Sequence, residues 1–352
     1  TPTGTVPLAD VVGPTEIVPG DFWIVNNTTT NISKLQALKN AVNTFAHQVR
    51  MSANGPDKTY GNEDDVAHRL AIVGYSSYYW DGTYYRNTEL LTGVTITNGN
   101  GTQFNHSPAT TNNQYPVGTG LTSGLDVALA DMSTDAGRNS VANAINALDG
   151  NGGTRTDRGM LMAQQIITAN PVNPAERMQV VVVFTDGAPT YHSDFSFEVA
   201  DRSLEFSESM KNSGVLVYTV GVFSGANCQA PIQPLANRVY DNDEGWVIRN
   251  TPANATSIAN ASNRFLHYLS SNYPDATALT GTYDRASGTE GFNTRYLAAN
   301  DAASLNSVFS QIARNVLNDY AQENLNEQST VLDIVSEFCD IPDTVIAGDV
   351  KI

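Results

Sequence analysis

Apolar residues along this chain follow two periods, one typical of buried strands and one typical of amphipathic helices. Val180–Phe184 is an unbroken run of five β-forming apolar residues, which is typical of a central strand buried on both faces of a parallel sheet. A helical stripe with spacings of three and four comes earlier in the chain. Its members are Leu35, Leu38, Val42, Phe45 and Val49.

Strands and helices are predicted to alternate over most of the chain. Further short apolar runs predict strands at Asp21–Val25, Leu70–Tyr75, Val215–Val222 and Phe292–Leu297. Further helices are predicted at Ser140–Leu148, Thr154–Ala169, Phe197–Asn212, Ala255–Leu269 and Ala302–Leu317. This alternation predicts a doubly wound α/β fold, with a mostly parallel sheet and helices on both faces.

The composition is that of a folded, acidic protein. Hydrophobic residues make up 41% of the chain, and 36 Asp and Glu against 19 Lys and Arg give a net charge of −17. Such a charge disfavours binding to nucleic acid or to an anionic membrane surface. No apolar stretch approaches the roughly 20 residues that span a bilayer, so we expect no membrane insertion. Because the chain begins at Thr1 without Met or a signal peptide, we expect a mature or excised fragment.

Two cysteines, Cys228 and Cys339, lie far apart in the sequence. Without a CxxC motif or a Cys/His cluster, a zinc site is not expected. The simpler interpretation is two free thiols. We expect a disulfide instead, because the neutral-polar, lysine-poor composition is common in extracellular proteins.

Candidate chemistry lies where two polar loops are expected to meet. Asp186 and Gly187 end the central strand, where open α/β sheets place their ligand sites, and Gly187 is expected to permit a sharp turn. Thr154 follows Gly152-Gly153 at a helix start. A hydroxyl and a carboxylate suit an oxygen-seeking ion such as Mg²⁺. Taken singly, Thr154 is equally a helix N-cap and Asp186 a turn residue that binds backbone amides.

These motifs carry a resemblance to a known family. GGTRTDRGM at Gly152–Met160, followed by VVVVFTDGAP at Val180–Pro189, resembles the second and third metal loops of von Willebrand factor type A domains. Ser33–Phe45 resembles the family's first helix, and Tyr296–Val316 its last strand and helix. Within the family the chain is most similar to tip adhesins of Gram-positive pili. The resemblance implies a Rossmann-like fold and an adhesion site that holds Mg²⁺ or Mn²⁺.

The resemblance also suggests how the chain is divided. Residues 21–320 form the domain, with insertions near 76–120 and 224–285. Residues 1–20 are an N-terminal extension, and 321–352 are a β-type segment of an adjoining module. The aromatic, Asn- and Gly-rich stretch 76–120 is too long for an ordinary connection and serves either as surface decoration or as a binding arm.

The family's first metal loop, Asp-x-Ser-x-Ser, is missing from its usual place. There the chain has Asn26-x-Thr28-x-Thr30. In one interpretation the hydroxyls of Thr28 and Thr30 replace the serines as direct ligands, and Asn26 supplies a neutral oxygen. In the other, the true first loop is absent and metal binding is in doubt. Asp131-x-Ser133 and Asp194-x-Ser196 look similar but come too late, and are interpreted as solvent-exposed caps.

The resemblance implies binding without turnover. The expected function is a cell-surface or pilus module that binds a host or matrix protein through a metal-bridged acidic residue, with other pilus subunits as further partners. The alternative is a structural subunit with a vestigial metal site and contacts through the aromatic insertion. Hydrolase, P-loop and dinucleotide motifs are missing. A metal-assisted hydrolase with His192 as general base is the remaining enzymatic alternative.

Overall fold

The structure is a computed structural model. It describes residues 34–52, 67–76, 129–148, 153–174, 177–299 and 304–316. It also describes the backbone of helical residues 302–303 and 317–323 and of the short strands at 5–7, 23–25, 79–80, 85–86, 89–90 and 102–103. Most of the predicted extension, of the insertion at 76–120 and of the tail at 321–352 lies outside these residues.

A three-stranded parallel sheet forms the centre of the described fold. Its order is β10 (Val180–Thr185), β12 (Leu216–Gly221) and β15 (Tyr296–Ala298). Val180 pairs with Leu216, and Thr219 pairs with Tyr296. The parallel pairing of Val180–Phe184 with Val215–Val222 is therefore confirmed. The prediction that Val180–Phe184 is the central strand is wrong for the described residues, because β12 lies in the middle of the sheet and β10 at its edge. The strand predicted at Phe292–Leu297 covers only Tyr296–Ala298, because Gly291–Asn293 form a 3₁₀ turn before it.

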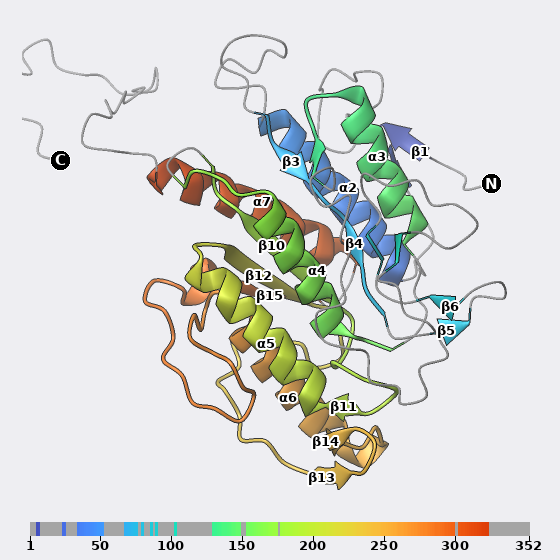
Figure 1. The fold of residues 1–352 in the computed structure, drawn as a ribbon, viewed down its shortest axis with the longest axis vertical. Helices are drawn as coiled ribbons and strands as arrows, with labels where there is room; N and C mark the ends of the chain where they lie inside the picture. Colours follow the sequence, from blue (N-terminus) through green and yellow to red (C-terminus); the bar gives the residue numbers. More distant parts are fainter. Residues whose placement is uncertain are drawn as a thin grey trace, which may run out of the picture.

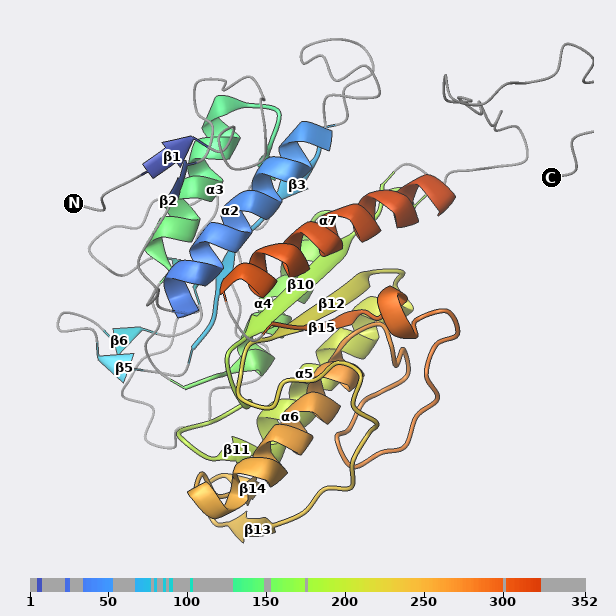
Figure 2. The same ribbon diagram turned by 180° about the vertical axis from the view of Figure 1, so that it is seen from behind.

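Helices cover both faces of this sheet because alternate side chains of β10 point in opposite directions. Val181 and Val183 pack into a core with α4 (Thr156–Ala169), α5 (Phe197–Asn212) and α6 (Ala255–Leu269). Val180, Val182 and Phe184 pack into a second core with α2 (Lys34–Ser52) and α7 (Ala302–Glu323). Figure 1 shows α4 and α5 in front of the strands, and Figure 2 shows α2 and α7 in front of them. The doubly wound α/β fold is confirmed.

A smaller core lies between α2 and α3 (Asp135–Ala147). The helix α3 begins five residues before the predicted Ser140, because the Thr134 hydroxyl accepts a hydrogen bond from the Gly137 backbone amide at 3.0 Å. This N-cap satisfies one of the amides at the helix start.

The prediction of one continuous strand at Leu70–Tyr75 is wrong. The structure has two short strands there, β3 (Arg69–Leu70) and β4 (Val73–Gly74). They pair antiparallel with β9 (Ala130–Asp131) and β7 (Glu89–Leu90). On the side that faces β10, neither strand pairs with another described strand. The segment is therefore not held straight by backbone hydrogen bonds on that side.

A cavity of about 500 Å³ separates this segment from β10. It is lined by apolar side chains of α2, α4 and α7, by residues 68–75 and by the edge of β10. The strand predicted at Asp21–Val25 does not fill it. Instead β2 (Trp23–Val25) pairs antiparallel with β1 (Thr5–Pro7), outside the parallel sheet. Among the described residues, β10 therefore has a partner strand only on its β12 side.

Three further short strands belong to the region around residues 76–120. β5 (Tyr79–Trp80) pairs with β6 (Tyr85–Arg86), and β8 (Thr102–Gln103) pairs with β7. The rest of that insertion lies outside the described residues.

The region 224–285 has more regular structure than an irregular insertion. A hairpin of β13 (Arg238–Asp241) and β14 (Gly245–Ile248) extends β11 (Phe195–Ser196) into a small antiparallel sheet. The 3₁₀ turns η1 (Pro252–Asn254) and η2 (Gly291–Asn293) precede α6 and β15. None of the described helices is both long and apolar enough to cross a membrane.

Cys228 is half-buried and forms no disulfide with any described residue. Its expected partner, Cys339, lies outside the described residues, so the pairing stays a prediction.

A close contact between Gly159 and Tyr75 gives a test of how α4 packs on β4. A Cβ atom at Gly159 would lie 2.8 Å from the Tyr75 ring, and the Tyr75 hydroxyl donates a hydrogen bond to the Phe184 carbonyl. We expect Gly159→Ala to destabilise the protein by about 1–3 kcal/mol in urea unfolding, although alanine favours a helix interior by about 1 kcal/mol.

The same substitution in a Tyr75→Ala background is the control. Without the ring to displace, Gly159→Ala should become stabilising by up to about 1 kcal/mol through helix propensity alone. Equal effects in both backgrounds would contradict this contact.

Candidate metal centre

The turn after β10 presents Asp186 at the carboxyl edge of the sheet. The Thr185 hydroxyl donates to the Gly187 carbonyl at 2.9 Å and accepts from the Gly187 amide at 3.3 Å. Gly187 has no positive φ, so the expectation that glycine permits this turn is wrong. The Thr185 side chain holds the turn instead.

The loop that carries Thr154 is bonded directly to the loop that follows Asp186. The Thr154 amide donates to the Thr190 hydroxyl at 2.7 Å, and the Thr190 amide donates to the Thr154 carbonyl at 3.0 Å. The two polar loops that were predicted to meet are therefore adjacent, and their spacing is fixed by a reciprocal pair of hydrogen bonds.

Among the described residues, none forms a hydrogen bond with the side-chain oxygens of Thr154 or Asp186. Thr154 does not cap α4: the N-cap position is Arg155, and no side chain caps this end. No described residue donates a hydrogen bond to the exposed Asp186 carboxylate. Both residues line the end of the cavity at which β10 stops. The capping and turn interpretations are therefore wrong for these two side chains.

A buried ion network lies directly beneath the Thr154 loop. Arg155 is 1% exposed and Asp157 2% exposed. Arg155 donates two hydrogen bonds to the Asp157 carboxylate at 2.8 and 2.7 Å, and Arg202 of α5 donates a third at 3.0 Å. The Arg155 guanidinium also lies 4.7 Å from the centre of the Tyr191 ring. The network thus joins α4, α5 and the loop after β10.

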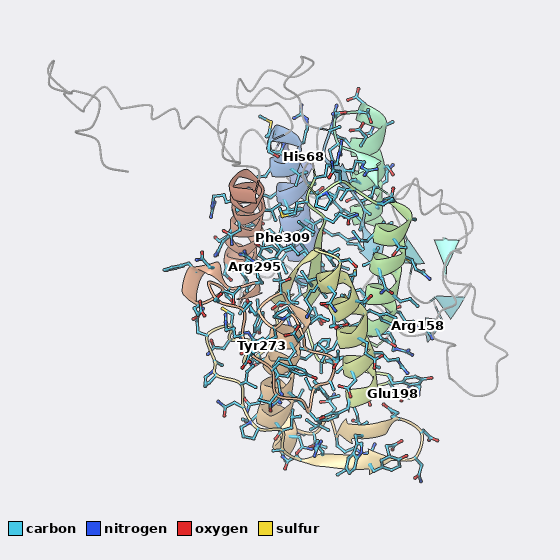
Figure 3. All side chains as sticks on the ribbon, turned by 60° about the vertical axis from the view of Figure 1, so that its left-hand side comes forward. His68, Arg158, Glu198, Tyr273, Arg295 and Phe309 are labelled. Atoms are coloured by element: carbon cyan, nitrogen blue, oxygen red, sulfur yellow. The ribbon has the colours of Figure 1, made fainter. Side chains whose placement is uncertain are left out.

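Sequence reasoning missed this network. Its signal was the alternation of Arg and Asp in TRTDR at the start of α4, which was interpreted only as part of a metal loop. Arg202 also forms an ion pair with Glu198 at the surface. Figure 3 shows Arg158 of α4 and Glu198 of α5 on the same side of the molecule.

The network keeps Asp157 ionised. Burial by itself would raise the pKa of Asp157, but the hydrogen bonds and charge of Arg155, with the charges of Arg202 and Arg158, outweigh it and lower that pKa. This carboxylate is therefore committed to arginine and is not offered to a cation.

The other candidate residues are not brought to this edge by described structure. Asn26, Thr28 and Thr30 lie outside the described residues. Within the described ranges, no three His, Cys, Asp or Glu side chains are grouped as a metal site. His192 is exposed and stacks edge-on against Tyr191 at 4.8 Å between ring centres. No hydrogen bond joins it to Asp186.

The two motifs that resemble the first metal loop, Asp131-x-Ser133 and Asp194-x-Ser196, form local hydrogen bonds, but they are less exposed than expected. The Asp131 carboxylate accepts hydrogen bonds from the Ser133 amide and hydroxyl at 2.9 and 2.7 Å. Asp194 is 8% exposed and accepts from the Asn250 amide and Arg249, each at 2.8 Å. The expectation of solvent-exposed caps is therefore wrong for Asp194, which holds the end of the β13–β14 hairpin.

Residues 125–261 match the family model for the von Willebrand factor type A domain. This part of the chain is a von Willebrand factor type A (vWA) domain. The match includes the loops of Thr154 and Asp186. The wider extent of the vWA domain, from residue 21 to 320, stays a prediction.

Two crystal structures of the pilus adhesin SpaC from Lactobacillus rhamnosus GG, one in an open conformation, are similar to this chain. They align with 83% and 82% of it at 11% and 12% sequence identity, with TM-scores of 0.46 and 0.44. The aligned parts are 29% and 28% of those chains, so this chain spans less than a third of their length. No curated protein matches this chain.

Removing the negative charge from the buried network should destabilise the vWA domain strongly. Asp157→Asn removes the carboxylate charge that Arg155 and Arg202 share, at an expected cost of about 3–5 kcal/mol in urea unfolding at neutral pH. Because the pKa of Asp157 is lowered by folding, its contribution is present above the unfolded pKa of about 3.9. It is lost as pH falls through the folded value, so the gap between variant and parent should narrow in acid.

Glu198→Gln is the matched control, since Glu198 also pairs with Arg202 but its side chain is 54% exposed. Its expected cost is no more than about 1 kcal/mol. Similar losses of unfolding free energy for the two substitutions would show that the buried ion pairs of Asp157 stabilise the protein no more than the exposed pair of Glu198 does.

Proposed function

We propose that this chain is an adhesin module that binds an acidic residue of a partner protein through a divalent cation, Mg²⁺ or Mn²⁺. The observation that carries the proposal is a pair of oxygens, the Thr154 hydroxyl and the Asp186 carboxylate, on adjacent loops of a vWA domain, where neither is hydrogen-bonded to a described residue. Hard cations prefer oxygen ligands of these two kinds.

The fit of these residues to such an ion is good but incomplete. Two oxygens fill part of an octahedral shell, and the predicted first-loop ligands Asn26, Thr28 and Thr30 are the chain's remaining candidates. Thr30 precedes Lys34 by four residues, and the Lys34 ammonium donates to the Val222 carbonyl, just beyond the end of β12, at 3.0 Å. The start of α2 is thereby held at the same edge of the sheet as Asp186.

A bound cation would supply one open position for a carboxylate oxygen from the partner. The protein's part is to hold Thr154 and Asp186 at a fixed separation, which the Thr154–Thr190 hydrogen bonds achieve. With one protein carboxylate among the described candidate ligands, the ion would keep much of its charge and attract an outside carboxylate strongly. Binding without turnover is the proposed outcome.

The proposed setting is the cell surface or a pilus of a Gram-positive bacterium. The proposed partners are a host matrix or surface protein and other pilus subunits. The net charge of −17 supports a cation bridge, because an acidic partner would otherwise be repelled by this chain.

Isothermal titration of the full chain with MgCl₂ and MnCl₂ tests the metal site directly. We expect one site, with affinity weakened by more than about tenfold in Asp186→Asn and in Thr154→Ala, since each removes a ligand oxygen. Asp243→Asn is the matched control: it removes the same charge from the exposed turn of the β13–β14 hairpin and should leave binding unchanged.

Absence of cation binding, or equal weakening in all three variants, would overturn the metal proposal. The chain would then be better explained as a structural subunit that makes metal-independent contacts. Turnover that His192→Ala abolishes would overturn the proposal of binding alone.

A further inference from the structure

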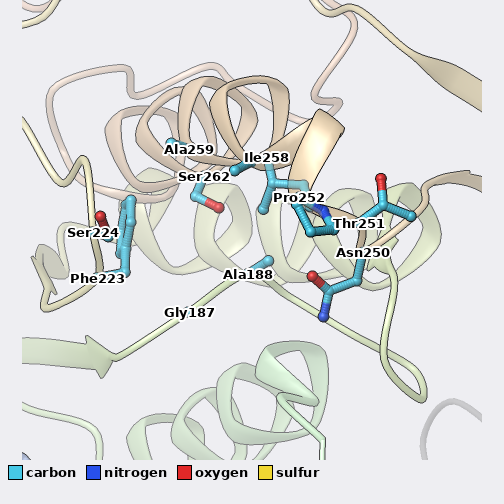
Figure 4. A pocket seen from close by; sticks show the side chains of 11 residues that line it. Gly187, Ala188, Phe223, Ser224, Asn250, Thr251, Pro252, Ile258, Ala259 and Ser262 are labelled. Carbon is cyan, nitrogen blue, oxygen red and sulfur yellow. The ribbon is translucent and has the colours of Figure 1, made fainter.

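A second concave site lies beside the candidate metal centre. It is a pocket of about 360 Å³, at the small end of the range for binding sites in proteins. Gly187 and Ala188, which directly follow Asp186, form one wall. Residues after β12 and at the start of α6 form the others, among them Phe223, Pro252 and Ile258. Figure 4 shows these side chains around a common space.

The walls of this pocket are held in place by hydrogen bonds. Asn263 of α6 donates to the Gly225 carbonyl at 2.8 Å and accepts from the Asn227 amide at 2.8 Å, which fixes the loop that carries Phe223. On the opposite side Asp194 accepts from the Asn250 amide at 2.8 Å. These hydrogen bonds fix two walls of the pocket, which reduces the ordering required when a ligand binds.

One polar side chain in the pocket lining has no hydrogen-bond partner among the described residues. This is Ser262, which is 1% exposed and whose hydroxyl forms no hydrogen bond within the part of the chain that the structure describes. Figure 4 shows this hydroxyl directed from α6 into the space between Phe223 and Ile258. A buried hydroxyl without a partner costs free energy of folding. A ligand that brings a hydrogen-bonding group to this point would recover that cost.

We propose that this pocket binds a tyrosine side chain of the partner protein, next to the acidic residue that the cation bridges. The apolar walls match the ring, and the Ser262 hydroxyl matches the phenol, which both donates and accepts hydrogen bonds. Tyrosine is also enriched at protein interfaces because it combines an apolar body with a polar tip. The inference rests on the proposed function for its partner, but the pocket does not require the cation.

The test uses p-cresol, the side-chain analogue of tyrosine, with toluene as the analogue that lacks the hydroxyl. Both are titrated against the full chain by saturation-transfer difference NMR in EDTA, so that failure of the metal site cannot affect the result. We expect p-cresol to bind about threefold to tenfold more tightly than toluene, the contribution of one hydrogen bond. In Ser262→Ala this preference should disappear.

Two further variants locate the binding. Ala255→Phe places a ring at an exposed lining position and should abolish binding of both probes. Ala253→Phe makes the same change two residues earlier, at an exposed position outside the pocket lining, and should have no effect. Thermal unfolding checks that each variant folds, and Ser262→Ala should unfold at a higher temperature than the parent.

Absence of p-cresol binding would overturn the proposal, as would equal affinity for p-cresol and toluene in the parent chain. Binding that survives Ala255→Phe would place the ligand elsewhere and would also overturn it. Loss of p-cresol binding with intact Mg²⁺ binding would leave the proposed function standing without this pocket.

Discussion

The reciprocal hydrogen bonds between Thr154 and Thr190 are the constraint on which the candidate site depends. They join two loops that are 36 residues apart in sequence, and they use backbone groups of Thr154 while leaving its hydroxyl available. Beneath them, the buried Arg155–Asp157–Arg202 network ties the same loops to α4 and α5. A cation site needs oxygens at a fixed separation, and here the spacing is set by contacts that do not involve the ligand oxygens themselves.

The candidate site and the Ser262 pocket share one structural origin. Both lie where parallel strands end and helices begin, so their walls are loops held between rigid elements. Asp186 belongs to one site and Gly187 to the other. A change in the turn after β10 would therefore alter both sites together, whereas a change on α6 would reach only the pocket.

The sequence predicted the sheet, the helices and the two loops because these follow from periodicity and from strand-end polarity. Phe197–Asn212 and Ala255–Leu269 were predicted at their observed bounds, since their apolar stripes and end signals agree. The split of Leu70–Tyr75 was not predictable, because it depends on which strands lie beside it. The burial of Arg155 and of Ser262 was missed for a related reason. Tertiary packing decides whether a polar side chain is buried, and the spacing of apolar residues in the sequence does not predict it.

The cavity beside β10 has a consequence for how the protein behaves in solution. One edge of a valine-rich strand, without charge or proline from Val180 to Phe184, lacks a partner strand among the described residues. Such an edge is a template for pairing with another chain. Among the described residues, it is shielded by α2, α4, α7 and residues 68–75, which line the cavity beside it. Conditions that loosen these elements would expose the edge and favour self-association. Recovery of this protein after heating should accordingly depend on its concentration.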